Sequence, residues 1–503
     1  MALLNLSLPQ ASLLGLSLPL LALLLHALLQ QPIRRGATPI PKAPNTLPLL
    51  GNALHFLRPR HELLAWFAAC QRRHGHATLQ ISVPTSRSRD LFGHGIINAD
   101  GHLWKAQRRA GLAFLSAANL RVLTEAALPL YLREAVEGLG ARADGRCRVD
   151  LQAVFHEITT RLMGRMAYDM EMHADDEFTL AFEYASGATA ERFQNPLWRF
   201  TELLFGFRFR RALALDGGDE EKTETREDAL GGISGSLVRS LLEAIGDETL
   251  VADAALNYLS AGRDTTAQGL TWTLHLLMRH PHEAAKMRRE IRRILRSAGG
   301  SASEPDPSLF TPTSAPYTLA VFYEALRFYP PIPIEIKQTT APSTLPDGTF
   351  LPKDSVLVWS PWSMNRSEIT WGPDVAEFRP DRWLSYSSAP SASHPLSSPS
   401  SSPTISPSDD GEVPRFVNRS VGEFPVFNGG PRICLGKKMA ELIAVQVLAV
   451  VVWSFDFVDA ATPGPDGTIP ERKSPISLTL PMKGGLPCFV RKRSYTDEDV
   501  YGG

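Results

Sequence analysis

The sequence predicts one mainly α-helical domain with a minor β-sheet. Apolar residues recur at helical spacing over most of the stretch from Leu91 to Tyr329. Short β-like pieces occur near Ala77–Val83, Gly348–Trp359 and Ile476–Arg491. The chain has 503 residues, 44% of them apolar, so it can bury a large core, and its length suits one large domain or two ordinary ones.

Residues 1–30 are predicted to form a membrane anchor. The run from Ala11 to Leu29 is apolar and leucine-rich, and about twenty such residues span a bilayer. A cleaved signal peptide is the alternative, but the residues before the run lack Lys and Arg, and no small-x-small cleavage site follows. Arg34 and Arg35 come next, and the positive-inside rule places the following residues in the cytosol. Proline-rich residues 31–50 then form a stiff hinge before a folded domain over 51–503.

Composition excludes some classes of function. The 52 basic and 53 acidic residues balance, which gives no sign of nucleic-acid binding. The four cysteines have no C-x-x-C or framework spacing, so we expect a reducing compartment without disulfides.

A long helix is predicted from Leu250 to Met278, with Asp253 as its N-cap. Gly262 in its middle costs about 1 kcal/mol relative to alanine, so its presence needs a reason. The polar step at Asp264 and Thr265 suggests that reason, a groove in which water and other small molecules can sit. The alternative is that Thr265 bonds to a helix carbonyl while Asp264 pairs at the surface.

A second helix carries an E-x-x-R pair, Glu324 and Arg327, and ends at Pro330. The i, i+3 spacing places both charges on one helix face, where an exposed pair stabilises by only about 0.2–0.5 kcal/mol. The pair alone therefore indicates little. Arg379 and Arg382 follow about fifty residues later, in the segment E-F-R-P-D-R-W.

Residues 427–436 form a glycine-bracketed loop around Cys434, just before an apolar helix predicted over Met439–Val452. The N-terminus of a helix carries partial positive charge, which favours a thiolate. Arg432 adds a fixed cation that suits a carboxylate. The alternative is that Cys434 is only a small buried hydrophobic residue.

The loop pattern F-x-x-G-x-R-x-C-x-G resembles the haem-binding loop of the cytochrome P-450 monooxygenases. The W-x-x-x-R, A-G-x-D-T and E-x-x-R motifs also occur in the order of that family. The resemblance implies the P-450 fold and haem b (iron protoporphyrin IX) on a thiolate ligand, which favours O–O cleavage. It implies that Cys434 ligates the iron and that Asp264 and Thr265 deliver protons. The remaining implied positions bind the cofactor (Trp104, Arg108, Lys337, Phe427, Arg432, Gly436) or lock the core (Glu324, Arg327 and either Arg382 or Arg379).

The chain departs from the family pattern at three places. Residues 84–91 and 211–232 are too short for the usual end of the first sheet and for the usual pair of lid helices. Part of the first sheet and of the lid helices is therefore expected to be missing, with an exposed sheet edge and an open pocket. A gene-model error is the simplest explanation, and an inactive relative is the next. Residues 385–410 are a Ser/Pro-rich tract that we expect to be a disordered surface insertion.

Phrases beside the motifs resemble the eukaryotic, microsomal fatty-acid and alkane terminal hydroxylases, with a fungal source expected. These phrases are Asn98–Gly101, Leu345–Phe350 and Trp371–Asp374. That branch implies an aliphatic substrate in a channel lined by Pro331–Ile336 and Pro481–Leu486. One alternative is a polyketide or terpenoid hydroxylase of fungal secondary metabolism. Another is a haem-binding remnant without turnover.

No flavin- or nicotinamide-binding region follows the haem domain. We therefore expect electrons from a separate NADPH–cytochrome P-450 reductase, with cytochrome b5 as a second donor. Arg432, Lys437 and Lys438 suggest a docking surface near the cysteine loop. The expected location is the endoplasmic reticulum membrane, with a single span and a cytosolic catalytic domain.

Overall fold

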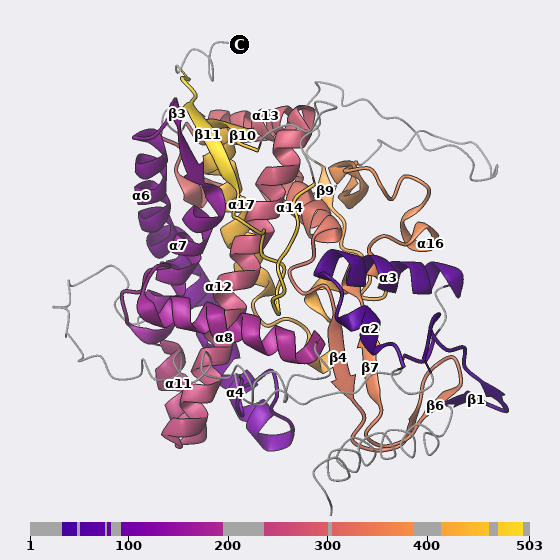
Figure 1. Cartoon of the computed structure of the whole chain (residues 1–503). Coiled ribbons are helices and arrows are strands. Elements are labelled where there is room, and N and C mark those ends of the chain that lie inside the picture. Colours follow the sequence, from indigo (N-terminus) through magenta and orange to yellow (C-terminus); the bar gives the residue numbers. More distant parts are fainter. Residues whose placement is uncertain are drawn as a thin grey trace, which may run out of the picture.

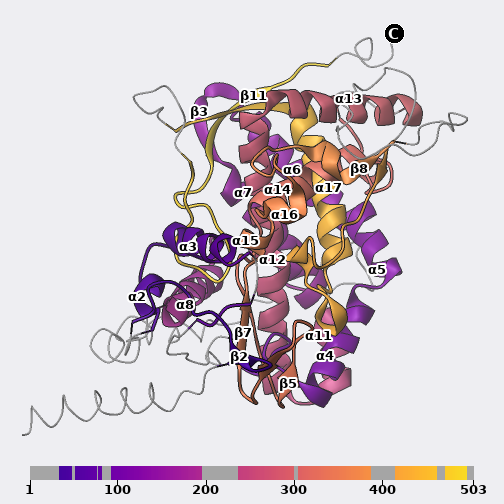
Figure 2. The ribbon, with the colours of Figure 1, turned by 90° about the vertical axis from the view of Figure 1, so that its right-hand side faces the viewer.

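A computed structural model describes residues 33–47, 51–75, 78–81, 92–194, 236–299, 304–386, 414–461 and 471–495. Helices dominate, and α12 (Glu248–Arg279) runs through the middle of the molecule (Figure 1). On one side of it lie α6 (Leu128–Gly140) and α7 (Leu151–Met163), and on the other lies α14 (Pro316–Phe328). In Figure 2, a quarter turn away, α17 (Lys437–Ser454) is seen beside α12, on the side that faces away from the viewer in Figure 1. The predicted mainly α-helical fold is confirmed.

The other α-helices of the described residues are α2 (Ala53–Phe56), α3 (Arg60–Arg73), α4 (Gly101–Phe114), α5 (Ala117–Val122), α8 (Glu177–Gln194), α11 (Ser236–Ile245), α13 (Pro281–Ala298), α15 (Pro361–Met364) and α16 (Glu368–Trp371). Two π-helical turns join this set, η1 (Leu123–Ala127) and η2 (Gly164–Tyr168). Short 3-10 turns are η4 (Pro307–Leu309), η5 (Pro380–Trp383), η6 (Pro425–Phe427) and η7 (Gly430–Arg432).

The strands are short and all named pairs are antiparallel. They are β1 (Arg34–Arg35), β2 (Thr38–Pro39), β3 (Asp144–Asp150), β4 (Glu335–Gln338), β5 (Ser343–Thr344), β6 (Thr349–Leu351), β7 (Val356–Trp359), β8 (Leu384–Ser385), β9 (Arg415–Phe416), β10 (Phe455–Asp459) and β11 (Pro487–Lys492). Their order is β2-β1-β6-β5 in one sheet and β10-β11-β3 in a second, with β4-β7 and β8-β9 as separate pairs.

The β-like sequence pieces form strands only in part. Gly348–Trp359 contains β6 and β7, as predicted. Only the end of Ile476–Arg491 is a strand, β11, so most of that prediction is wrong. Of Ala77–Val83, the described residues hold a single bridge between Gln80 and Lys42. Neither β3 nor β10 was predicted.

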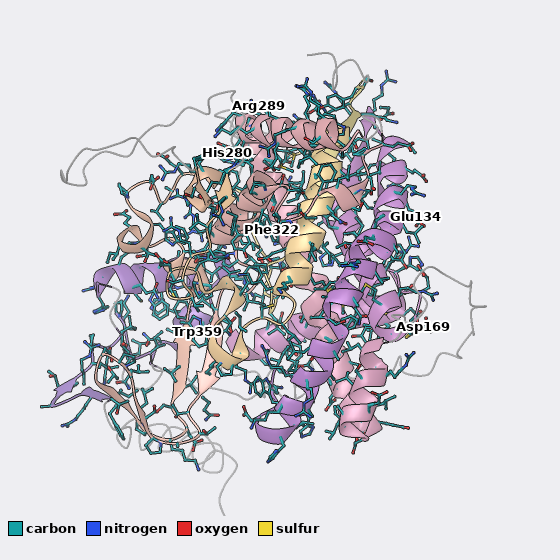
Figure 3. The ribbon with its side chains drawn as sticks, turned by 180° about the vertical axis from the view of Figure 1, so that it is seen from behind. Glu134, Asp169, His280, Arg289, Phe322 and Trp359 are labelled. Carbon is teal, nitrogen blue, oxygen red and sulfur yellow. The ribbon has the colours of Figure 1, made fainter. Side chains whose placement is uncertain are left out.

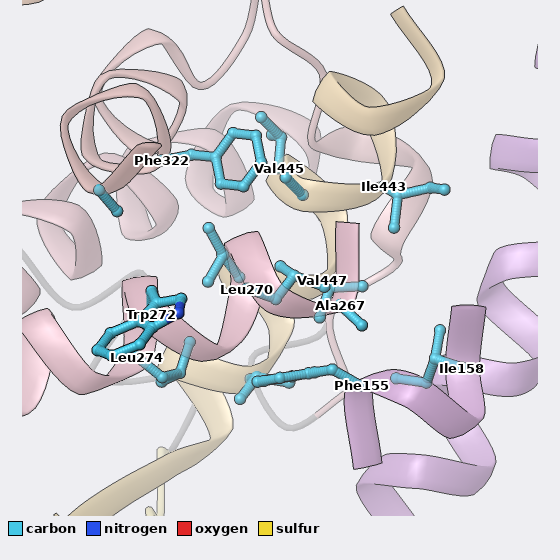
Figure 4. Packing of buried hydrophobic residues seen from close by; sticks show 14 of the residues in the cluster. Phe155, Ile158, Ala267, Leu270, Trp272, Leu274, Phe322, Ile443, Val445 and Val447 are labelled. Carbon is cyan, nitrogen blue, oxygen red and sulfur yellow. The ribbon is translucent and has the colours of Figure 1, made fainter. Parts of the chain in front are cut away.

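The core forms where α7, α14 and α17 pack against α12. In Figure 4, Phe155 of α7, Leu270 and Trp272 of α12, Phe322 of α14 and Val447 of α17 lie close together. All five are buried, and burying each large apolar side chain contributes about 1.5–3 kcal/mol. Because helices surround α12, its residues are buried on every side over most of its C-terminal half.

The start of α12 differs from the prediction. The helix begins at Glu248, where Oδ1 of Asp247 accepts a hydrogen bond from the backbone N–H of Leu250 at 3.0 Å. Asp253 is therefore not the N-cap. Its Oδ2 instead accepts the backbone N–H of His94 at 2.8 Å, which ties α12 to the segment before α4.

The β4–β7 pair lies on one flank of the molecule. Seen from behind in Figure 3, Phe322 lies centrally, and Trp359 marks β7 on the flank away from Asp169. Among the described residues, β4 and β7 pair only with each other. Ile336 and Val358, which lie opposite each other in this pair, are 49% and 40% exposed, so one face of the pair is open to solvent.

Several sequence predictions fall outside the described residues. These are the anchor over 1–30, the short regions over 84–91 and 211–232, and nearly all of the tract over 385–410. Among the described helices, no single one has the length and hydropathy of a membrane span. Gly101–Phe114 and Ala117–Gly140 have them only when taken together, and this pair is bent by 47° at its break.

Candidate active site

The cysteine loop is shaped by η6 and η7 in front of α17. Gly430 has a φ of 61°, in the left-handed region that favours glycine. A Cβ on Gly429 would lie 2.6 Å from Cγ1 of Val421, so the backbone passes too close for a side chain. The backbone N–H of Cys434 donates to the carbonyl oxygen of Phe427 at 2.7 Å and closes the loop. The backbone of this loop therefore requires glycine at both positions.

The side chain of Cys434 is accessible, although protein atoms surround it closely. The side chain is exposed, yet burial by the protein around it raises the pKa of the thiol. Backbone N–H groups of Gly436 and Lys437, at the start of α17, and the charge of Arg108 act in the opposite direction. The expected thiolate-favouring effect of the helix start is therefore present but smaller than that of burial. An accessible thiol surrounded by protein marks a hollow.

The helix α12 comes close to the cysteine loop beside α4. A Cβ on Gly111 of α4 would lie 2.2 Å from Oη of Tyr258 and 2.5 Å from Cδ2 of Leu435, so α4, α12 and the cysteine loop meet there. Ala261 and Thr265 follow Tyr258 by three and seven residues, which places them on the same helix face. Both are accessible, in a helix whose neighbouring residues are mostly buried. A stripe of α12 therefore lines the hollow.

Trp104 and Arg108 of α4 lie beside the cysteine loop, where the family resemblance implied them. Nη1 of Arg108 donates to the carbonyl oxygen of Ile433 at 3.1 Å. The guanidinium carbon of Arg432 lies 4.5 Å from the Trp104 ring centroid, and that of Arg108 lies 5.7 Å from it. The structure thus brings three of the predicted cofactor-binding residues together.

Arg432 also ties the loop to the segment before α4. Its guanidinium donates to the carbonyl oxygens of Ile96 at 3.1 Å and Ala99 at 2.7 Å, and to Oδ1 of Asp100 at 2.6 Å. The sequence analysis did not predict Asp100 as a partner of Arg432, although Asp100 lies within the phrase Asn98–Gly101 that it singled out. Three of the five N–H donors of arginine are used by described residues, which leaves two for a bound carboxylate.

Lys337 lies on β4. It is exposed, with Nζ 5.4 Å from the ring centroid of Trp359 on β7. Two residues earlier, Glu335 is partly buried, and burial raises the pKa of its carboxyl to about 7. The charge of Glu335 also raises the pKa of Cys434, so this carboxyl acts on the hollow. Nothing in the sequence around Glu335 indicated that its carboxyl lies near Cys434.

The E-x-x-R pair forms the centre of a buried network. Glu324 is fully buried, and its carboxylate accepts from Nε and Nη2 of Arg327 at 2.9 and 2.8 Å. It also accepts from Nε of Arg382 and Nε1 of Trp383, both at 2.9 Å. Arg379 contributes only its backbone N–H, at 3.0 Å. Of the two candidate arginines, the side chain that completes the network is therefore that of Arg382.

Asp264 and Thr265 occupy different environments. Thr265 Oγ1 donates to the carbonyl oxygen of Ala261 at 2.7 Å, as the alternative interpretation expected. Asp264 does not pair at the surface, because it is only 6% exposed and its Oδ1 lies 3.2 Å from Nη1 of the buried Arg263. Burial raises the pKa of Asp264 to about 6, while Arg263 opposes that rise.

The glycine in α12 has a packing reason that the sequence did not reveal. A Cβ on Gly262 would lie 2.5 Å from Sδ of Met163, because α7 crosses α12 closely at this point. Gly262 is therefore explained by the close contact between α7 and α12, and not by a groove as the sequence suggested. The same crossing brings His156 of α7 to within 3.9 Å of Asp264, which sequence reasoning also missed.

These residues fit haem b. The accessible thiol of Cys434 and the accessible stripe of α12 form two walls of one hollow, and Trp104, Arg108 and the two unused donors of Arg432 suit the propionates. When bound, haem supplies the activation of dioxygen. The chain's own residues then hold the cofactor, exclude water and move protons.

Comparison with known proteins agrees with this site. The family model described as Cytochrome P450 matches residues 239–489. Cytochrome P450 94A2 of Vicia sativa is 31% identical over 427 residues, covering 80% of this chain and 76% of that protein. Cytochrome P450 86B1 of Arabidopsis thaliana is 30% identical over 447 residues, covering 82% and 73%. Cytochrome P450 monooxygenase cyp1 of Mycosarcoma maydis is 25% identical over 509 residues, covering 88% and 74%.

The motifs, the hollow between Cys434 and α12, and the relatives at 30% identity or more lead to one conclusion. The chain belongs to the cytochrome P450 family of haem-dependent monooxygenases.

Proposed function

We propose that this chain hydroxylates an aliphatic substrate, a fatty acid or an alkane, at the end of its hydrocarbon chain. The observation that carries the proposal is the uncharged lining of the hollow. On the turn of α12 that follows Tyr258, Ala261 and Thr265 are accessible, whereas the charged Arg263 and Asp264 are buried. A substrate on this face therefore meets alkyl and hydroxyl groups, which favours a hydrocarbon over a charged group.

Sequence phrases support the same branch. Asn98–Gly101, Leu345–Phe350 and Trp371–Asp374 resemble the fatty-acid and alkane hydroxylases of microsomes. The apolar run from Ala11 to Leu29 and the basic pair after it favour a single span in the endoplasmic reticulum membrane, with the enzyme on the cytosolic side.

The proposed electron donors are NADPH–cytochrome P450 reductase and cytochrome b5. Two of the three basic residues suggested for docking already have partners. Arg432 is bound to Asp100, and Nζ of Lys437 lies 3.8 Å from Oε1 of Glu441. Lys438 is exposed and is the stronger candidate for an acidic partner surface.

Proton movement is assigned to Asp264 and Thr265. Asp264 has a pKa of about 6, so near neutral pH it can both hold and release a proton. Thr265 donates its hydroxyl proton to Ala261 but keeps its oxygen lone pairs on the accessible side of α12. The hydroxyl can therefore accept a hydrogen bond from water in the hollow, one residue away from the carboxyl.

The first test is a carbon monoxide difference spectrum of the reduced full chain, with Cys434→Ala as the control. A thiolate-type Soret band is expected for the natural chain and not for the variant. Retention of both band and turnover in Cys434→Ala would contradict the assignment of the ligand.

The second test is turnover of medium- and long-chain fatty acids and alkanes with reductase and NADPH. Hydroxylation at the chain end supports the proposal. A thiolate band with turnover only of polyketides or terpenoids would favour a role in secondary metabolism. A band without oxygen-dependent turnover of any substrate would identify an inactive relative.

A further inference from the structure

We propose that His156 is a positioning residue for Asp264. Its Nδ1–H donates a hydrogen bond to Oδ1 of the ionised carboxyl and thereby sets the pH at which Asp264 takes up a proton. This role of His156 rests on the proton-delivery role of Asp264 proposed above. It adds a residue that lies on α7, about a hundred positions earlier in the chain.

Two unsatisfied atoms carry the inference. Nδ1 of His156 and Oδ1 of Asp264 are both buried and have no hydrogen-bond partner among the described residues. They lie 3.9 Å apart, on two helices that run side by side (Figure 1). Buried polar atoms are normally paired, and a hydrogen bond between Nδ1 of His156 and Oδ1 of Asp264 would pair both of these atoms at once. A separation of 3.9 Å exceeds a hydrogen bond by about 1 Å, within reach of a small side-chain rotation.

The neighbouring cation, Arg263, lies close to Asp264 but leaves its Oδ1 without a hydrogen bond. Nη1 of Arg263 lies 3.2 Å from Oδ1 of Asp264 without forming a hydrogen bond to it. The guanidinium is held in place by its other donors, with Nε on Oγ1 of Thr160 at 2.9 Å and Nη2 on Oε1 of Glu183 at 2.5 Å. Arg263 is only 1% exposed and is fixed from two further helices, so it contributes charge while a directed donor is still missing.

The protonation states of the two side chains suit a hydrogen bond from Nδ1 of His156 to Oδ1 of Asp264. Burial, together with the charge of Arg263, lowers the pKa of His156 to about 3, so the imidazole is neutral near pH 7. Burial raises the pKa of Asp264 to about 6, with Glu183 adding to the rise and Arg263 opposing it. A neutral imidazole has one N–H, and the ionised carboxylate selects the tautomer with that proton on Nδ1.

The other charged groups of α7 face away from this pair. Nδ1 of His173 lies 2.7 Å from Oε1 of Glu157, and Nε of Arg161 donates to Oε1 of Glu171 at 2.8 Å. Arg263 and Glu183 are therefore the charges that act on Asp264 from α12 and α8, and His156 is the donor supplied by α7.

The test follows the carboxyl directly, without turnover. Infrared difference spectra of the ferric, haem-loaded protein are recorded across pH, and the protonated carboxyl band is assigned by its loss in Asp264→Ala. His156→Phe removes the donor and is expected to raise the apparent pKa of Asp264 by at least about one unit. His156→Asn places an amide N–H where Nδ1 stood, and it is expected to keep the midpoint of the natural chain. A midpoint in His156→Phe equal to that of the natural chain would overturn the proposal.

A second measurement needs no substitution at His156. Nitrogen-15 NMR of histidine-labelled, reduced and carbon monoxide-bound protein reports the tautomer of His156. The Nδ1–H form is expected in the natural chain, with a change in Asp264→Ala. The Nε2–H form in both proteins would overturn the proposal, even if His156→Phe failed to fold.

Both readouts are independent of the substrate. A chain that binds haem but oxidises no lipid would still show the His156-dependent titration. If the chain hydroxylates fatty acids but the titration midpoint of Asp264 is unchanged in His156→Phe, only the proposed role of His156 is contradicted.

Discussion

Thr265 places a hydroxyl at the accessible face of α12 while donating its proton inside the helix. Thr265→Ala should leave haem binding intact and cost no more than about 1 kcal/mol of folding free energy, because only one intrahelical hydrogen bond is lost. It should also release more peroxide per NADPH consumed, since α12 loses the hydroxyl to which the proposal assigns proton movement.

Thr265→Ser keeps the hydroxyl and serves as the matched control for coupling. Peroxide and product are measured against NADPH under identical conditions for all three proteins. Fully coupled turnover in Thr265→Ala would show that the hydroxyl has no part in proton movement.

His275 should make the protein sensitive to acid. It is 1% exposed, and burial lowers its pKa from 6.5 to about 4, so the folded state binds this proton less readily than the unfolded state. Its contribution to stability is therefore present above pH 6.5 and lost as the pH falls toward 4. Between pH 6.5 and pH 5 this loss is about 2 kcal/mol.

His275→Gln should remove that part of the acid dependence, measured as urea unfolding of the haem-loaded protein at both pH values. His61→Gln, at an exposed position on α3, is the control and should unfold like the natural chain. An equal acid loss in His275→Gln and the natural chain would show that other groups carry the dependence.

Single residues were predictable where a motif is local. Cys434, Asp264 and the Glu324–Arg327 pair all lie in short patterns that can be recognised within a few residues. Met163 and His156 could not be found in this way, because each acts on a residue about a hundred positions later, where α7 crosses α12. A lone histidine or methionine on an apolar helix carries no local signal of such a contact.

At the scale of elements, the Glu324 network joins α14 to η5. Glu324→Ala would leave Arg327 and Arg382 buried without their counter-ion, which should cost about 3–5 kcal/mol of folding free energy. Denaturant unfolding measures the loss, and failure to accumulate folded, haem-loaded protein is the extreme form of the same result.

Arg379→Ala is the matched control for that network. Its side chain is 44% exposed and pairs with Asp374, while its backbone N–H to Glu324 survives the substitution. A change of less than about 1 kcal/mol is expected, as for other exposed pairs. Equal losses for Glu324→Ala and Arg379→Ala would contradict the central position of Glu324.

Helices were easier to predict than strands for a physical reason. A helix such as α17 makes its backbone hydrogen bonds within itself, so the apolar run from Met439 to Val452 already contains its signal. Strand β3 bonds to β11, with Val149 opposite Cys488, so its partner lies more than three hundred residues away. Nothing within Asp144–Asp150 reveals that partner, and the strand was missed.

At the scale of the whole molecule, a short pair of strands joins the two ends of the Ser/Pro-rich tract. Ser385 pairs with Arg415, and Leu384 with Phe416, in the short β8–β9 pair that lies on either side of residues 387–413. Replacing residues 387–413 by a short Gly/Ser turn should therefore leave the thiolate spectrum unchanged. Stability should rise by no more than about 1 kcal/mol, because loop entropy depends only weakly on length.

This deletion is checked by the carbon monoxide spectrum and by the thermal midpoint of the shortened chain. Its control is removal of an equal length that includes β8 and β9, which should destabilise the protein. A lost spectrum in the first variant would show that the tract contributes to the fold and would contradict its prediction as a surface insertion.

The family and its fold followed from the ordered motifs, while the shape of the hollow did not. The motifs place α12, α14 and the cysteine loop in one chain order, and the structure shows that α12, α14 and the helix after the loop, α17, share a core. The accessible stripe at Ala261 and Thr265 depends on which helices approach α12, and that is a property of the assembled molecule.

The enclosure of α12 has a consequence for hydrogen exchange. Residues from Thr266 to Leu277 are buried on every side, so their amide hydrogens cannot meet solvent through fraying or a local opening. They exchange only when the whole molecule unfolds, and their slowest rate therefore reports the global free energy of unfolding. Because a cofactor that binds only the folded state adds to that free energy, the same amides would record haem retention without any spectrum of the haem itself.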